Sequence, residues 1–236
     1  MGDLRALPYT ISMPDPFHHY KRGFWTPARK NSMYMGIVLL GLALLIQITL
    51  GHYSSGWAAL SAPAHDIFLD NLPVIDLGGI IVAGAITLWV AAWLLLIYEP
   101  KYLIFGTKAI SLFIISRAFF MSLTHIGAYP LSAAPSPDNA GFSLYHMLTF
   151  QGNFFYSGHT AFPFLLALIF WDRVLLRRAF LALTFFFGAT MLLAHVHYSI
   201  DVFAAPFIIY GIFAITAKLF PDDYALLPHA HGGVLQ

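Results

Sequence analysis

The chain has 236 residues, of which 59% are hydrophobic and only 10% are charged. This composition excludes an ordinary water-soluble domain, in which about a quarter of the residues are charged. The net charge of +1 gives no indication of a nucleic-acid partner, and we expect none. Because the chain has no Cys, disulfides, zinc–thiolate sites and cysteine nucleophiles are excluded as well.

Apolar runs about long enough to cross the ~30 Å hydrocarbon core of a bilayer recur along the chain. Inside lipid the backbone polar groups must bond to one another, so these runs are expected to be helices. We therefore predict an all-α, polytopic membrane protein with six transmembrane helices. The expected spans are 32–50, 76–98, 109–127, 156–171, 178–196 and 200–217, within a membrane catalytic domain 32–218 that lies between an interfacial segment 1–31 and a tail 219–236.

The distribution of Lys and Arg predicts the orientation of these helices. Every basic residue except Arg117 lies before the first span, between spans two and three, between spans four and five, or at the end of span six. The other three connections, about 51–75, 128–155 and 196–199, have none. By the positive-inside rule both termini are expected in the cytosol, and these three connections are expected to face the periplasm or an organelle lumen. A bacterial inner membrane is the expected location.

Two segments outside the spans carry further expectations. The connection 128–155 is rich in Pro, Ser, Gly and Asn, and it is long enough either to fold over a site as a lid or to remain a plain mobile loop. The tail from Pro221, with His229 and His231, is expected to be disordered.

His197 and Asp201 are the first pair of residues that could carry chemistry. They are four apart, so they share a face where the chain is helical. A carboxylate in that position can accept the ring N–H of the histidine and leave the other ring nitrogen free as a nucleophile. The alternative is a purely structural helix cap, in which Asp201 accepts backbone N–H groups.

Ser157, Gly158, His159 and Thr160 form the second polar group, at the expected start of span four. A helix start offers N–H groups and a positive dipole end to a phosphate, and Gly158 allows its close approach. His159 could donate a proton to a departing oxygen, while Ser157 and Thr160 could add hydrogen bonds to phosphate oxygens. The alternative is an interfacial histidine beside a helix cap.

Arg117 is the single basic residue inside an expected span. A charge at mid-span costs about 2.5–3.5 kcal/mol on insertion scales, so it should face the interior of the bundle and have a partner. A bidentate clamp on a phosphate fits this position, and so does an ion pair with Asp201 or Asp66. Its depth, about 15 Å from Gly127 at helical rise, leaves open whether it reaches the site.

A metal site is the weaker interpretation of the histidines. His195 and His197 are two apart, so on a helix they point to nearly opposite faces, and few other ligands lie near them in the sequence. We expect no metal ion and no other cofactor.

The two polar groups and their flanks resemble the sphingomyelin synthase family, a branch of the type 2 phosphatidic-acid phosphatase superfamily. The segments that carry this resemblance read GNFFYSGHT at 152–160 and LAHVHYSIDV at 193–202. Weaker matches lie at Pro63–Asp66 with Asp70, and at Arg117–Thr124 with Pro130. Together they cover roughly residues 60–218.

The resemblance implies a six-helix fold with a His–His–Asp triad that needs no metal. Carried over by position, His197 would be the nucleophile, Asp201 would orient it, and His159 would protonate the leaving group. The matched motifs also make Tyr156 and Asp66 candidate substrate-binding or phosphate-binding residues, beside Arg117, Ser157, Gly158 and Thr160. A phospholipid donor would give its phosphate or phospho-headgroup through His197 to water or to a lipid alcohol similar to ceramide or diacylglycerol.

The chain departs from the family pattern at several positions. Asn153 and Val196 stand where these synthases usually carry Asp, His65 changes the Pro-Leu-Pro-Asp element, and His125 replaces a Thr. All three triad residues remain, so catalysis is still expected, but the choice of headgroup is put in doubt.

Four functions compete at this point. The leading one is a phosphotransferase of sphingomyelin-synthase type, and its nearest rival is a lipid phosphate phosphatase on the same scaffold, with water as acceptor. A non-catalytic lipid-binding or ion-binding membrane protein and a metal-dependent membrane hydrolase are the others. Rhomboid-type proteolysis is disfavoured because His159 directly follows the Ser-Gly pair, which does not suit a Ser–His dyad.

Overall fold

The computed structural model describes residues 23–123, 125–133 and 155–231, although the side chain of His231 is not described. This part of the chain forms seven α-helices and one short 3-10 helix, and it contains no β-strand. The all-α prediction is therefore confirmed. The helices are α1 Pro27–Ala58, α2 Gly78–Tyr98, α3 Pro100–Leu123, α5 Gly158–Ile169, α6 Val174–Leu193, α7 Ser199–Leu219 and α8 Pro221–Tyr224, and the 3-10 helix η2 is Pro228–His231.

Five of the described helices, namely α1, α2, α3, α6 and α7, are long and apolar enough to cross a membrane. The fourth expected span, 156–171, is instead the shorter helix α5, which has 12 residues. At 1.5 Å per residue α5 is about 18 Å long, well short of the ~30 Å hydrocarbon core. The prediction of a multi-pass membrane fold fits these helices, but the fourth helix differs from a full-length span.

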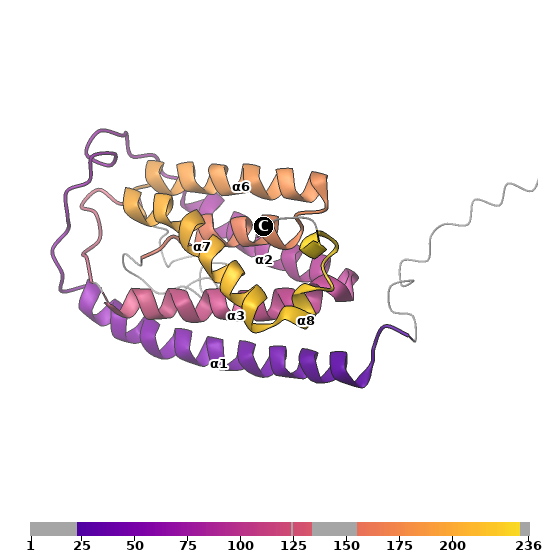
Figure 1. The fold of residues 1–236 in the computed structure, drawn as a ribbon. Helices are drawn as coiled ribbons and strands as arrows, with labels where there is room; N and C mark the ends of the chain where they lie inside the picture. The colour runs from indigo at the N-terminus through magenta and orange to yellow at the C-terminus, as the bar shows by residue number, and fades with distance from the viewer. Residues whose placement is uncertain (1–22, 124, 134–154, 232–236) are drawn as a thin grey trace, which may run out of the picture.

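The long helices surround α5. Figure 1 shows α1 lying along α3, with α6 on the opposite side of the bundle and α7 crossing obliquely between them. Nine of the 12 residues of α5 are buried, and its residues are apolar on every side. A helix with no polar face lies in a protein core or in a membrane, and the burial of α5 places it in the core. The large residues of α5 pack accordingly: Phe162 stacks on Trp89 of α2, with ring centroids 4.1 Å apart.

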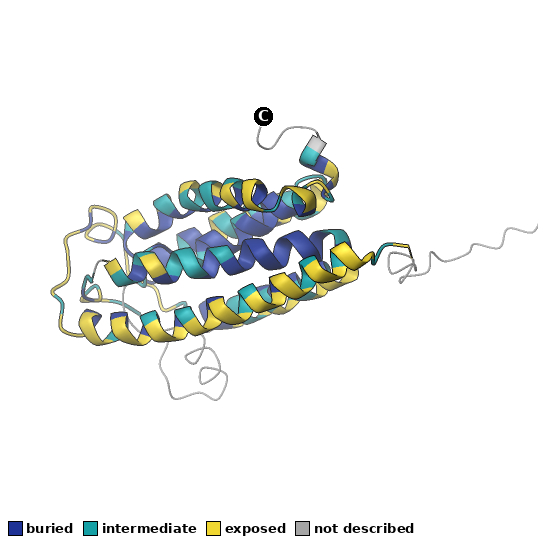
Figure 2. Cartoon of the chain, turned by 60° about the horizontal axis from the view of Figure 1, so that its bottom comes forward, coloured by how far each residue is buried: buried dark blue, intermediate teal, exposed yellow. Residues whose placement is uncertain are grey.

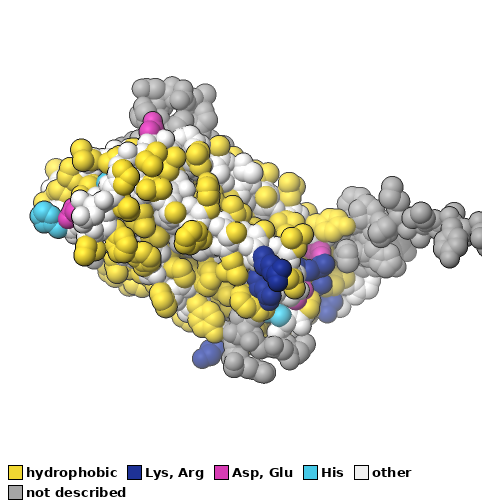
Figure 3. All heavy atoms as spheres, turned by 90° about the horizontal axis from the view of Figure 1, so that it is seen from above, with side chains coloured by type: hydrophobic (Ala, Val, Ile, Leu, Met, Phe, Trp, Pro, Cys, Tyr) yellow, Lys and Arg dark blue, Asp and Glu magenta, His cyan; other side chains and the backbone are white. Residues whose placement is uncertain are grey.

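The outer surface of the bundle is apolar. Figure 2 shows α1 mostly exposed, while the helices behind it are mostly buried. Figure 3 shows hydrophobic side chains covering much of one face, with the visible Lys and Arg side chains in one half of the molecule. Exposed Leu, Ile, Val or Phe side chains on all five long helices are typical of contact with lipid chains.

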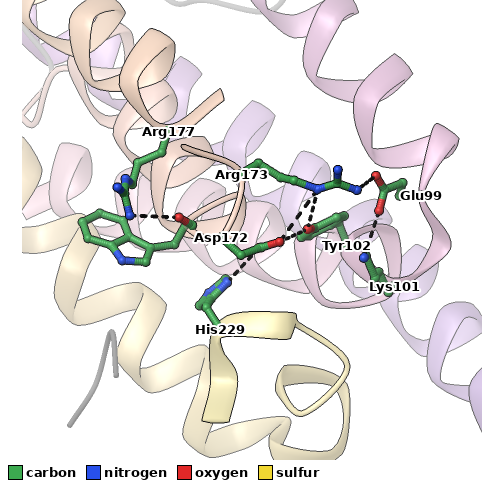
Figure 4. Close-up of polar contacts among 8 residues, drawn as sticks. Glu99, Lys101, Tyr102, Asp172, Arg173, Arg177 and His229 are labelled. Atoms are coloured by element: carbon green, nitrogen blue, oxygen red, sulfur yellow. Dashed lines mark hydrogen bonds and ion pairs between the residues drawn. The ribbon is translucent and has the colours of Figure 1, made fainter. Parts of the chain in front are cut away.

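Apart from Arg117, the described Lys and Arg side chains gather at one end of the bundle, which we call the basic end. There Glu99 pairs with both Lys101 and Arg173, and Asp172 accepts a hydrogen bond of 2.6 Å from the hydroxyl of Tyr102 (Figure 4). The opposite end, which holds the turn between α6 and α7, we call the site end.

The C-terminal segment folds back over the basic end, so the expectation of a disordered tail from Pro221 is wrong for residues 221–231. Leu227 is fully buried, and the buried ring of His229 places Nδ1 3.1 Å from Oδ1 of Asp172 (Figure 4). The composition of the tail does not reveal this packing, because it depends on contacts of Asp223 and His229 with residues far away in the sequence. Residues 1–22 lie outside the described residues, and so do residues 134–154, which make up most of the connection 128–155. The structure therefore does not test whether this connection is a lid or a plain loop.

Asp223 forms the second attachment of this segment. Its carboxylate pairs with Lys108 of α3, whose side chain is fully buried, and accepts a hydrogen bond of 2.7 Å from the hydroxyl of Ser32 on α1. The Asp223 carboxylate thus joins α8 to α3 through the ion pair and to α1 through the hydrogen bond.

Lys108→Met is expected to lower the free energy of unfolding by about 3–5 kcal/mol, because it leaves the Asp223 carboxylate buried without its cation. The double variant Lys108→Met/Asp223→Leu should recover most of that loss, since no buried charge remains. Lys101→Met is the control, and it should cost at most about 1 kcal/mol because Lys101 is partly exposed. Thermal unfolding in detergent measures all three, and a Lys108→Met protein that melts with the wild type would contradict the assignment.

Candidate active site

His197 and Asp201 meet at the start of α7. Nδ1 of His197 lies 3.2 Å from Oδ2 of Asp201, and both side chains are buried. The same Oδ2 accepts the backbone N–H of Tyr198, also at 3.2 Å. Asp201 therefore caps the helix and contacts the histidine at once, so the two interpretations of this pair are compatible. With Nδ1–H directed at the carboxylate, Nε2 of His197 carries the free lone pair.

His159 faces this pair from the first turn of α5. The ring centroids of His159 and His197 are 6.4 Å apart, with their planes at 62°. A nucleophile acts on an atom about 3–3.5 Å away, and an acid lies about 2.6–3.2 Å from the oxygen that it protonates. The two imidazoles therefore lie close enough together to contact the same phosphate group.

Arg117 lies at the depth of the α5 start. Its Nε donates a hydrogen bond of 3.3 Å to the backbone oxygen of Tyr156, just before α5. A Cβ added to Gly158 would lie 3.1 Å from the same Nε, so the glycine provides the room in which the guanidinium sits. Arg117 therefore reaches the start of α5, although it lies six residues, about 9 Å of helix, before the end of α3.

Ser157 and Thr160 serve the local structure of α5. The hydroxyl of Ser157 accepts the amide N–H of Thr160 at 3.4 Å and its hydroxyl at 3.2 Å, and both side chains are buried. The amide of Ser157 donates to the backbone oxygen of Asp201 at 3.0 Å. This last bond fixes the start of α5 against the start of α7, and so sets the position of His159 relative to His197.

Tyr156 is also occupied by contacts within the protein. Its side chain is fully buried, and its hydroxyl lies 2.9 Å from Oγ of Ser116 on α3. The structure thus brings His159, His197, Asp201, Arg117 and Gly158 together, while the polar side-chain atoms of Tyr156 and Ser157 bond within the fold.

Asp66 holds the α7 start from the connection between α1 and α2. Its Oδ2 accepts the amide of Ser199 at 2.7 Å, and its Oδ1 accepts the amides of Phe68 and Leu69 at 2.9 and 3.2 Å. Burial opposes ionisation of this carboxyl, but these N–H groups outweigh burial and hold the pKa of Asp66 below its ordinary value of 3.8. The contacts support a positioning role for Asp66 rather than contact with phosphate.

The depressed pKa of Asp66 predicts how stability depends on pH. The unfolded chain takes up this proton more readily than the folded one, so the carboxylate stabilises the fold at pH values above 3.8 and stops doing so as the pH falls below. We expect Asp66→Asn to melt below the wild type at pH 7 and to approach it at pH 3. Thermal unfolding from pH 7 to 3 tests this, and two melting curves separated equally at all pH values would contradict it.

Sequence reasoning missed two residues that line or brace the site. Tyr198 donates from its hydroxyl to the backbone oxygen of Gly127 at 3.1 Å and accepts the amide of Ala64 at 2.9 Å, which ties three connections together. Phe187 of α6 lies 6.1 Å from His159, ring centroid to ring centroid. The position of Tyr198 in the sequence, between His197 and Asp201, could have identified it as a residue of the site. Nothing in the sequence distinguishes Phe187 from the other aromatic residues of α6.

The comparisons with known proteins address the same region. Residues 152–218 match a family model described as PAP2 superfamily C-terminal, a segment that holds His159, His197 and Asp201 but not Arg117 or Asp66. The match supports the type 2 phosphatidic-acid phosphatase superfamily. It does not distinguish the sphingomyelin synthase branch. The chain matches no curated protein and no solved structure.

The match to this family model and the five long apolar helices together fit a membrane scaffold for lipid phosphatases and phosphotransferases. Within the described residues no group of three or more His, Cys, Asp or Glu side chains is arranged to hold a metal ion.

Proposed function

We propose that the chain is an integral-membrane lipid phosphotransferase of sphingomyelin-synthase type. The observation that carries the proposal is the placement of two imidazoles 6.4 Å apart, with a carboxylate behind one of them and a guanidinium at the same depth. The donor would be a phospholipid in the leaflet at the site end, and the acceptor a lipid alcohol similar to ceramide or diacylglycerol.

In the first step, Nε2 of His197 attacks the phosphorus, and the bond from phosphorus to the donor's lipid oxygen breaks. His159 gives its proton to that oxygen, so the donor leaves as a neutral alcohol. Asp201 accepts the Nδ1–H of His197 and stabilises the positive charge that develops on the ring. Arg117 would balance the phosphate charge from the start of α5.

In the second step, His159, now without its proton, takes the proton of the acceptor hydroxyl. The acceptor oxygen attacks the phosphorus, the bond to Nε2 breaks, and His197 is regenerated. These residues thus supply nucleophile, acid–base and charge stabilisation without a cofactor.

A phosphatase with water as the acceptor is the second candidate, because the family match fits phosphatases and phosphotransferases alike and specifies no acceptor. Purified protein distinguishes the two when it is given labelled phosphatidylcholine with ceramide or with a diacylglycerol whose acyl chains differ from the donor's, and separately labelled phosphatidic acid. Label in a new phospholipid supports the transferase. Label released only as water-soluble phosphate would contradict it and leave the phosphatase.

A further inference from the structure

The turn between α6 and α7 places a histidine where helices commonly end in glycine. The amide of His195 bonds to the oxygen of Leu192 and the amide of Val196 to the oxygen of Met191, both at 3.1 Å. This pair of bonds requires a left-handed residue just after the helix, and His195 has φ of 52°. A side chain with a Cβ is unfavourable in that conformation, so the backbone alone does not explain the histidine.

The ring of His195 is also buried without the hydrogen bonds that burial requires. The residue is 1% exposed, and neither ring nitrogen has a hydrogen-bond partner among the described residues. A neutral imidazole has one donor and one acceptor nitrogen, and burying both unpaired is unfavourable. Backbone strain and unpaired polar atoms that persist together are typical of functional sites.

The surroundings of this ring connect it with the triad. Tyr129 packs edge-on against His195, with ring centroids 5.1 Å apart, and also lies 6.1 Å from Tyr198. Tyr198 is the residue whose amide bonds to Asp201. Tyr129 is itself held by its hydroxyl, which donates to Asp70 at 2.6 Å. His195 therefore lies under a tyrosine at the site end, in the same short turn as His197.

We propose that His195 selects the acceptor lipid, a role that rests on the phosphotransferase function proposed above. Its two ring nitrogens match a polar group that both donates and accepts, namely a second hydroxyl or an amide beside the reacting hydroxyl. Ceramide carries such groups. Diacylglycerol offers ester carbonyls, which only accept and leave the acceptor nitrogen of the ring unpaired. Tyr129 moves aside when the lipid binds.

The test compares ceramide with a diacylglycerol in mixed micelles that contain one labelled phosphatidylcholine donor. The acyl chains of the diacylglycerol differ from those of the donor, so its product is separable from the donor. The wild type should use ceramide at least about tenfold better than diacylglycerol in kcat/KM, the difference of one buried neutral hydrogen bond. His195→Phe keeps a ring against Tyr129 but has no nitrogen, and it should lose about tenfold with ceramide while its rate with diacylglycerol stays unchanged. His195→Gly suits the left-handed turn, and it should lose the preference in the same way.

His65→Ala is the control, because His65 is a fully exposed histidine of the same end, near Asp70. It should keep the wild-type preference. Retention of that preference in His195→Phe or in His195→Gly would overturn the proposal, and so would a wild type that uses the two acceptors equally. If the wild type forms neither a new phospholipid nor labelled protein, the phosphotransferase function itself is wrong. If the wild type and the His195 variants are labelled normally and share one acceptor preference, only the role of His195 is wrong.

Discussion

Replacing His197 by alanine is expected to abolish turnover and the covalent intermediate together. Brief exposure of the wild type to donor labelled at phosphorus should leave label on the protein that is lost in acid and kept in base, as a phosphorus–nitrogen bond requires. His197→Ala should carry none, and its kcat should fall by at least about 10³, because the substitution removes the imidazole that Asp201 orients as the nucleophile.

His125→Ala is the matched control for this experiment. His125 belongs to the same end of the bundle and stacks on Trp57, with centroids 6.3 Å apart. Its removal should leave both the labelling and the turnover at wild-type levels. Label that persists on the His197→Ala protein would refute the assignment of the nucleophile, and label lost equally in both variants would point to a general disturbance of this end.

Replacing His159 by alanine is expected to slow the first step in a way that depends on the leaving group. With a natural phospholipid donor the departing alkoxide needs a proton, so the rate of labelling should fall about 10²- to 10⁴-fold. A donor analogue that releases p-nitrophenolate leaves without protonation, and its rate should fall less than about tenfold. Single-turnover labelling with both donors measures the two effects separately.

Phe187→Leu tests whether such losses come from disturbed packing instead. Phe187 lies 6.1 Å from the ring of His159 and transfers no proton. Its replacement should slow both donors by the same factor. If His159→Ala also slows both donors equally, His159 positions the substrate and is not the acid.

Much of this fold could be predicted from apolar run lengths. Five of the six expected spans correspond to long helices, because lipid leaves an apolar run of that length one stable conformation. The expected span 156–171 is longer than α5 because the apolar run in the sequence extends past both ends of the helix, through Tyr156 and Phe170. The helix is shortened by Ser157, whose hydroxyl caps it, and that contact depends on geometry rather than on hydropathy.

The part of the candidate site in which two residues are close in the sequence could be predicted from their spacing. His197 and Asp201 are four residues apart on one chain segment, so their contact follows from helical geometry. The approach of His159 and Arg117 depends on the depth at which α5 begins, which no sequence pattern gives. Polar side chains such as Ser157, Tyr156 and Asp66 look alike in a sequence whether they bind a ligand or a backbone amide, and here each has a bond within the fold.

The short length of α5 has a consequence for how a lipid is handled. The aromatic side chains of Tyr53 and Trp57, both half exposed, lie near His125 just beyond the end of α3, where such residues typically mark the level of the headgroups. Arg117, whose side chain contacts the start of α5, lies six residues, about 9 Å of helix, before that end of α3. A phosphate bound beside Arg117 would lie below the membrane–water interface, closer to the level of the acyl chains. Any substrate must leave part of its hydration behind, which favours compact headgroups and gives each charged contact more strength than it would have at the membrane surface.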